Sequence, residues 1–164
     1  MSAVQTKTTT FTVDPVHSSI EFLVLDTENM MTTIRGRFTD FEGTIELPED
    51  GDGRITGLVR VASVTTDNEQ RDAHLRSPDF FDAENNPEIR FESTRVERAS
   101  DDTLNVAGTL TIRGTEIPVE LPTKIVGRGP DQKGDERIVL TAQGSLEWGP
   151  GKVDVSTNVS AVKS

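Results

Sequence analysis

The sequence predicts an all-β fold, an antiparallel meander that forms either a sandwich or a barrel. Apolar and polar residues alternate with a period of two over most of the chain, which is the pattern of half-buried strands. Turn signals such as 48–53 (PEDGDG) and 113–116 (RGTE) separate the runs. The 164 residues indicate one domain, residues 10–164, after an N-terminal extension (1–9) that we expect to be disordered.

The alternation assigns an inward face to each expected strand. The series begins with residues 18–24 and 32–47, and the second run is interrupted near Asp40. Phe38 and Phe41 lie three residues apart, so we expect a β-bulge between them if both face inward. The later runs are 88–97, 103–114, 116–126 and 152–162. Their expected inward residues are Ile89, Phe91, Leu104, Val106, Gly108, Leu110, Ile112, Ile117, Val119, Leu121, Val153, Val155, Thr157, Val159 and Ala161.

One segment, RDAHLRSPDFFD (71–82), interrupts the strands. Asn68 is suited to cap a helix, the residues after it tolerate helix, and Ser77-Pro78 should end it. We therefore expect one short helix near residues 68–76. The apolar side chains that follow or end it can turn inward and cap a barrel; these are Leu75, Phe80 and Phe81.

Composition excludes several classes of partner. The chain carries 28 acidic against 17 basic residues, a net charge of −11, which repels nucleic acid and anionic membrane surfaces. No apolar run approaches the roughly 18 residues of a membrane span, so we expect no nucleic-acid partner and no stable membrane insertion. The first residues lack the basic start and apolar stretch of a signal peptide. We expect a cytoplasmic protein, or a periplasmic or secreted one if a leader has been removed.

Few residues are suited to catalysis or metal binding. His17 adjoins Ser18, but neighbours on a strand point to opposite faces, so no Ser–His pair is expected. We expect His17 to hydrogen-bond to neighbouring backbone. His74 is the centre of one acidic cluster, completed by Asp72, Asp79 and Asp82. Asp-rich turns usually cap helices, so we assign no metal site, no cofactor and no catalytic residue.

Four segments resemble the YceI-like family, lipocalin-like barrels associated with polyisoprenoids. They are FTVDPVHSSIEF (11–22), IRGRFTDFEGTI (34–45), 68–94 and VAGTLTIRGTEIPVEL (106–121). The resemblance implies an eight-stranded antiparallel barrel with a short helix, enclosing an apolar channel. Three places depart from the family pattern. Asp26 or Asn29 stands where a histidine is expected, Ser145 replaces an arginine, and the turn at 149–151 is short, which implies a diverged or engineered member with an altered channel mouth.

The resemblance implies non-catalytic binding, transport or sequestration of a long-chain apolar small molecule. The candidates are a polyisoprenoid, an isoprenoid quinone or a prenyl diphosphate. The inward faces supply the expected channel residues: Phe22, Val24, Met30, Met31, Phe38, Phe80, Phe81, Phe91, Leu110, Ile112 and Trp148. Arg71, His74 and Arg76 are the expected partners of a polar head group. A homodimer stays open.

Two alternatives stay open beside this interpretation. One is a barrel enzyme, of the cyclase or isomerase type, acting on an isoprenoid or polyketide. The other is a stable scaffold whose interior is filled by its own side chains and binds nothing.

Binding energetics predict the length of the ligand. Burial contributes about 0.8 kcal/mol per CH₂, so about 4 kcal/mol per prenyl unit. Association costs roughly 4–15 kcal/mol, and micromolar affinity needs about 8 kcal/mol net. We therefore expect roughly three to six buried prenyl units if the tail alone supplies the energy.

Overall fold

The computed structural model describes residues 7–26, 31–148 and 151–164, and these residues form twelve strands, two 3₁₀ turns and one α-helix. The strands are β1 (Thr8–Val13), β2 (Ser19–Asp26), β3 (Thr32–Phe38), β4 (Phe41–Pro48), β5 (Arg54–Arg60), β6 (Val64–Thr65), β7 (Glu88–Ser100), β8 (Thr103–Ile112), β9 (Thr115–Glu120), β10 (Thr123–Pro130), β11 (Glu136–Trp148) and β12 (Gly151–Lys163). The helices are the 3₁₀ turns η1 (Pro15–His17) and η2 (Val61–Ser63) and the α-helix α1 (Glu69–Arg76).

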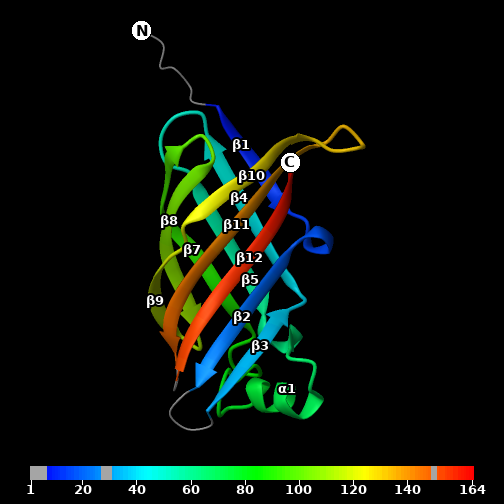
Figure 1. The fold of residues 1–164 in the computed structure, drawn as a ribbon, viewed down its shortest axis with the longest axis vertical. Coiled ribbons are helices and arrows are strands. Elements are labelled where there is room, and N and C mark those ends of the chain that lie inside the picture. Colours follow the sequence, from blue (N-terminus) through cyan, green and yellow to red (C-terminus); the bar gives the residue numbers. More distant parts are fainter. Residues whose placement is uncertain (1–6, 27–30, 149–150) are drawn as a thin grey trace.

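Eight strands close into an antiparallel barrel, as predicted (Figure 1). The hydrogen-bonded order is β1-β4-β5-β7-β8-β10-β11-β12, and β12 returns to β1 through the pairs Phe11↔Lys163 and Val13↔Ala161. Strands β2, β3 and β6 continue the sheet from the other part of β12, and β9 pairs with β8. The two ends of the barrel therefore differ. We call the end at β1 and the C-terminus the terminal end, and the end at α1 the helix end.

The helix lies where the sequence predicts it. The Asn68 side chain accepts a hydrogen bond from the backbone N–H of Arg71 at 3.0 Å, and α1 ends at Arg76 before Ser77-Pro78. The start of the domain differs, because Thr8 and Thr9 pair with β4 as part of β1 and do not belong to a disordered extension. No helix among the described residues is long and apolar enough to cross a membrane.

The expected bulge between Phe38 and Phe41 is absent. Strand β3 ends at Phe38 and β4 begins at Phe41, so the two residues between them form a corner that resets the alternation. The Ser63 hydroxyl oxygen fastens this corner by accepting hydrogen bonds from the backbone N–H groups of Thr39 and Asp40, at 3.2 and 3.0 Å. Both phenylalanines are buried.

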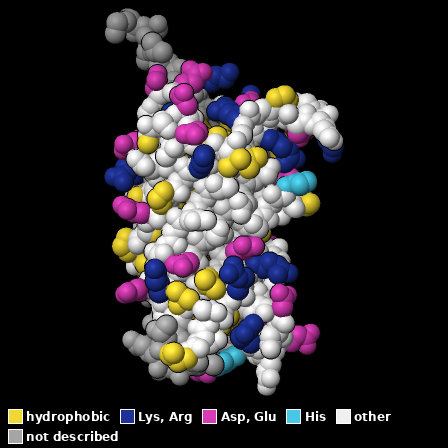
Figure 2. Space-filling view, in the orientation of Figure 1, with side chains coloured by type: hydrophobic (Ala, Val, Ile, Leu, Met, Phe, Trp, Pro, Cys, Tyr) yellow, Lys and Arg dark blue, Asp and Glu magenta, His cyan; other side chains and the backbone are white. Residues whose placement is uncertain are grey.

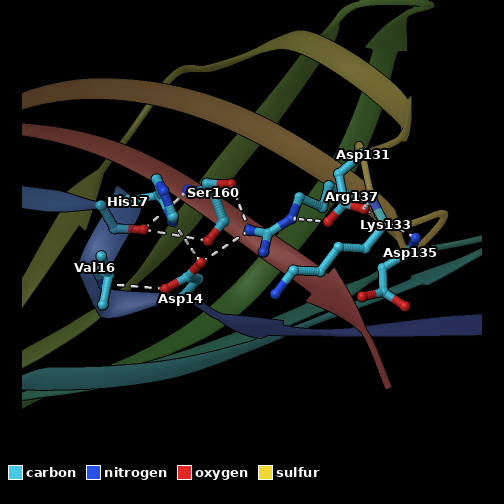
Figure 3. Close-up of polar contacts among 9 residues, drawn as sticks. Asp14, Val16, His17, Asp131, Lys133, Asp135, Arg137 and Ser160 are labelled. Carbon is cyan, nitrogen blue, oxygen red and sulfur yellow. Dashed lines mark hydrogen bonds and ion pairs between the residues drawn. The ribbon is translucent and has the colours of Figure 1, made fainter.

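A polar network fixes the corner between β1 and β2 (Figure 3). The Asp14 carboxylate caps η1, contacts His17 Nδ1 at 2.8 Å and accepts from Arg137 Nη1 at 2.9 Å. Arg137 Nε donates to Asp131 at 2.7 Å, which joins the corner to the loop after β10. Hydrogen bonds from His17 and Arg137 lower the pKa of Asp14 to about 2. The prediction that His17 bonds to backbone is wrong, because its ring pairs with this carboxylate.

The interior divides into two apolar clusters along the barrel axis. The terminal-end cluster contains the side chains with the least exposure, including Phe11, Leu104 and Ile138 at 0–1%. The helix-end cluster surrounds Phe22, Phe38 and Phe81 and includes Leu75 from α1. On the outer surface, acidic and basic side chains are interspersed over the visible face (Figure 2).

Candidate ligand-binding cavity

A cavity of about 290 Å³ lies inside the barrel, within the helix half. Its wall consists of the inward-facing side chains of most strands and of the segment that follows α1. Nine of the eleven expected channel residues line it: Phe22, Val24, Phe38, Phe80, Phe81, Phe91, Leu110, Ile112 and Trp148. The barrel interior is therefore hollow at this end, in contrast to the alternative of a filled scaffold.

The two expected methionines do not contribute to the observed wall. Met31 does not line the cavity, and 79% of its surface is exposed to solvent. It directly precedes β3, so the alternation that turns Ile34 and Phe38 inward does not govern it. Met30 lies outside the described residues.

Glycines at inward positions of the strands create much of the space. The five inward-facing glycines are Gly36, Gly43, Gly57, Gly108 and Gly144, and three of them, Gly43, Gly57 and Gly144, line the cavity. Aromatic rings cover two, because the Phe22 ring lies against Gly36 and the Phe91 ring lies against Gly108. At Gly57, by contrast, a Cβ would meet only the carbonyl oxygen of Glu42, at 3.4 Å. Of these five, the sequence prediction placed only Gly108 inward, although the period-two alternation would have identified the others.

An aromatic cap closes the helix end. Phe81 and Trp148 stack with ring centroids 4.9 Å apart and planes 11° apart, and Phe38 meets the edge of Phe81. The backbone N–H of Phe81 donates to the carbonyl of Leu75 at 3.0 Å, and Arg113 Nη1 donates to the carbonyl of Phe80 at 2.9 Å. Leu75, Phe80 and Phe81 thus turn inward as the sequence predicts, and α1 and the β8–β9 turn hold them in place.

The three expected head-group residues lie outside the cavity wall. Arg71 donates to Thr66, through Nε to the hydroxyl and through Nη2 to the carbonyl, both at 2.8 Å. His74 is exposed beside Asp79, with Nε2 3.3 Å from the carboxylate. Arg76 lies on the last turn of α1 and is half-buried. Their helix was predicted correctly, but it directs Arg71 and His74 to protein partners.

Polar groups inside the described part of the barrel are few, and all have partners. The buried polar residues there are Thr66, Asp72 and Thr123, and no buried side-chain nitrogen or oxygen lacks a hydrogen bond. Asp72 accepts from the backbone N–H and the hydroxyl of Thr66, so this buried carboxylate holds the entry to α1. Within residues 7–26, 31–148 and 151–164, no group of three His, Asp or Glu side chains is arranged to hold a metal.

The positions that depart from the family pattern contribute little to the described cavity. Ser145 is one of the residues that line the cavity, but it is exposed and donates its hydroxyl hydrogen to Asp154 at 2.6 Å across the β11–β12 pair. The side chain of Asp26, the whole of Asn29 and residues 149–150 of the short turn lie outside the described residues.

The cavity is shorter than binding energetics predict. Its inner limit is the terminal-end cluster, and Ile45, Val106 and Leu140 belong both to that cluster and to the cavity wall. An apolar cavity of roughly 150 Å³ holds a benzene-sized molecule, so about 290 Å³ holds about a dozen carbon atoms. This is fewer than the three to six prenyl units expected, because side chains fill the terminal half of the barrel.

Comparison with known proteins identifies related sequences over nearly the whole chain. The family described as YceI-like domain matches residues 11–161. Protein YceI of Escherichia coli O17:K52:H18 is 36% identical over 114 residues, covering 68% of this chain and 59% of that protein. A UPF0312 protein of Pectobacterium atrosepticum is 32% identical over 133 residues, covering 80% of this chain and 68% of that protein. The chain thus spans 59% of the length of the first relative and about two thirds of the second.

Solved structures share the fold at low sequence identity. Burkholderia cenocepacia BcnA superposes with a TM-score of 0.77 at 19% identity, covering 90% of this chain and 98% of that one. The YCEI protein of Campylobacter jejuni gives 0.74 at 22% identity, covering 84% and 89%. A structure described as a polyisoprenoid binding domain from Saccharophagus degradans, implicated in plant cell wall breakdown, gives 0.69 at 12% identity, covering 94% and 98%.

Proposed function

Because the chain belongs to the YceI-like domain family, we propose that its barrel binds an apolar chain, a polyisoprenoid or the tail of an isoprenoid quinone. The protein would carry or sequester this molecule without chemistry. One observation carries the proposal, namely the cavity of about 290 Å³ lined by apolar side chains inside the closed barrel. The polyisoprenoid binding domain of Saccharophagus degradans, which shares the fold, supports this class of ligand.

The wall offers the ligand contact area and few hydrogen bonds. Thr123, a polar residue at the inner wall, already donates its hydroxyl hydrogen to the carbonyl of Leu121 at 2.7 Å. Binding would therefore come from apolar burial, which is non-directional and tolerates ligands of related shape.

The enclosed part of a chain limits the affinity. About a dozen carbon atoms contribute roughly 10 kcal/mol of transfer free energy, and association costs at least about 4 kcal/mol. The difference corresponds to a dissociation constant of about tens of micromolar.

The single tryptophan provides the test. Trp148 lines the cavity and the chain contains no tyrosine, so the protein's long-wavelength emission reports on this site alone. Titration with farnesol, a neutral alcohol of three prenyl units, should change the emission saturably, and native mass spectrometry should show one bound molecule. An unchanged emission together with an unliganded mass spectrum would reject the proposal.

A further inference from the structure

We propose that the cavity selects neutral chains and encloses only about a dozen carbon atoms of them, to a depth set by Ile45, Val106 and Leu140. This inference rests on the proposed function and specifies which ligands the site prefers. Three properties of the cavity support it: its inner limit, its width and the charge of its wall.

The inner limit is a layer of packed side chains. Behind Ile45, Val106 and Leu140 lie Phe11 and Ile138, which are fully buried and do not line the cavity. Protein interiors pack at the density of organic crystals, so this cluster leaves no passage for a chain. A ligand that enters from the helix end therefore stops at Leu140, and its remaining length stays outside the cavity.

The cavity is also narrow. On β11, both Leu140 and Trp148 line the wall. Eight steps of about 3.3 Å on a strand tilted by about 40° span about 20 Å along the barrel axis. Dividing about 290 Å³ by this length gives a cross-section on the order of 15 Å². This mean width leaves room for no more than one chain at a time.

The wall carries no positive charge. None of the described residues that line the cavity is Lys, Arg or His. The segments 27–30 and 149–150 contain no basic residue in the sequence either. A diphosphate drawn into the cavity would lose its hydration without gaining a cation, which is costly, so the head of a prenyl diphosphate stays outside the cavity. The net charge of −11 also disfavours an anionic ligand.

A length series of neutral prenyl alcohols tests the depth. Geraniol, farnesol and geranylgeraniol carry two, three and four prenyl units, and each is titrated against the intact chain while Trp148 emission is recorded. We expect affinity to rise from geraniol to farnesol by about tenfold or more and then to stay level. A further tenfold rise to geranylgeraniol would overturn the inner limit. No binding of any alcohol would reject the proposed function itself.

Matched substitutions test which residues set the depth. Leu140→Ala should deepen the cavity and restore a rise of several-fold in affinity from farnesol to geranylgeraniol. Leu47→Ala is the control, because Leu47 is equally buried at 5% exposure in the same cluster but does not line the cavity. The milder Ile45→Val serves if Leu140→Ala does not fold, with the same direction expected. If affinity depends on ligand length in the same way in the Leu140, Ile45 and Leu47 variants, then Leu140 and Ile45 do not set the depth of the cavity.

The preference for neutral ligands is tested with two ligands that share the farnesyl tail and differ in the head group. Farnesyl diphosphate should bind at least about tenfold more weakly than farnesol. Raising the salt concentration should reduce this difference in affinity, because salt screens the acidic surface. Equal or tighter binding of the diphosphate would overturn the preference for neutral ligands, while farnesol binding would still uphold the proposed function.

Discussion

Gly57→Leu should stabilise the empty protein and weaken its ligand binding. A Cβ at Gly57 meets only the carbonyl oxygen of Glu42, at 3.4 Å, so the leucine side chain enters the cavity without backbone strain. The four carbon atoms of the leucine side chain occupy about a third of a cavity that holds about a dozen carbon atoms. Filling an apolar cavity adds about 0.5–2 kcal/mol to the free energy of unfolding. The ligand loses burial of about four carbons, roughly 3 kcal/mol, which weakens affinity about a hundredfold.

Two measurements separate these opposite effects. Urea denaturation without ligand gives the free energy of unfolding, and farnesol titration monitored by Trp148 emission gives the affinity. Gly129→Leu is the matched control, because a Cβ at Gly129 in β10 has open space and this residue does not line the cavity. The same farnesol affinity in both variants would refute the argument that Gly57 provides room for the ligand.

Three further outcomes are expected from the fold. Phe81→Ala should lower the free energy of unfolding by about 3–5 kcal/mol and speed ligand release in stopped-flow fluorescence, because Phe81 is buried and stacks on Trp148; unchanged release would argue against a cap. Gly108→Ala should cost about 1–3 kcal/mol in denaturation, because its Cβ would lie 2.6 Å from the Glu92 carbonyl oxygen, whereas Gly57→Ala should not; equal costs would refute this contrast. The pKa of Asp14 falls from 3.8 to about 2 on folding, so its contribution to stability is full above about pH 4 and is lost as pH falls toward 2. Melting temperatures of Asp14→Asn should therefore show a flatter acid slope than the parent, and parallel slopes would refute this.

The inward faces were predictable because each depends only on strand alternation. Leu110 and Ile112 on β8, and Phe91 on β7, line the cavity as their spacing indicates. The capping helix was predictable for a similar reason, since Asn68 and Ser77-Pro78 mark its ends in the sequence. Local rules of this kind predict most of the strands and the helix.

The failures involve partners distant in the sequence or competition between neighbours. The corner between Phe38 and Phe41 depends on the Ser63 hydroxyl, which lies more than 20 residues away in the chain. Arg71, which stays a predicted head-group partner, lies outside the cavity wall and donates to two acceptors of Thr66 at the entry to α1, a contact that strand alternation does not reveal. The depth of the cavity follows from how side chains from six strands fill the terminal end, which alternation alone does not specify.

The unequal filling of the barrel also has a consequence for motion. Opening a strand near Phe11 and Ile138 exposes fully buried side chains, whereas opening near Phe81 and Trp148 exposes the wall of a space that is already hollow. Amide hydrogens at the terminal end should therefore exchange with solvent only through global unfolding. Those around the aromatic cap should exchange through local opening, which has a lower free energy. The terminal end would then stay folded while the helix end opens and closes.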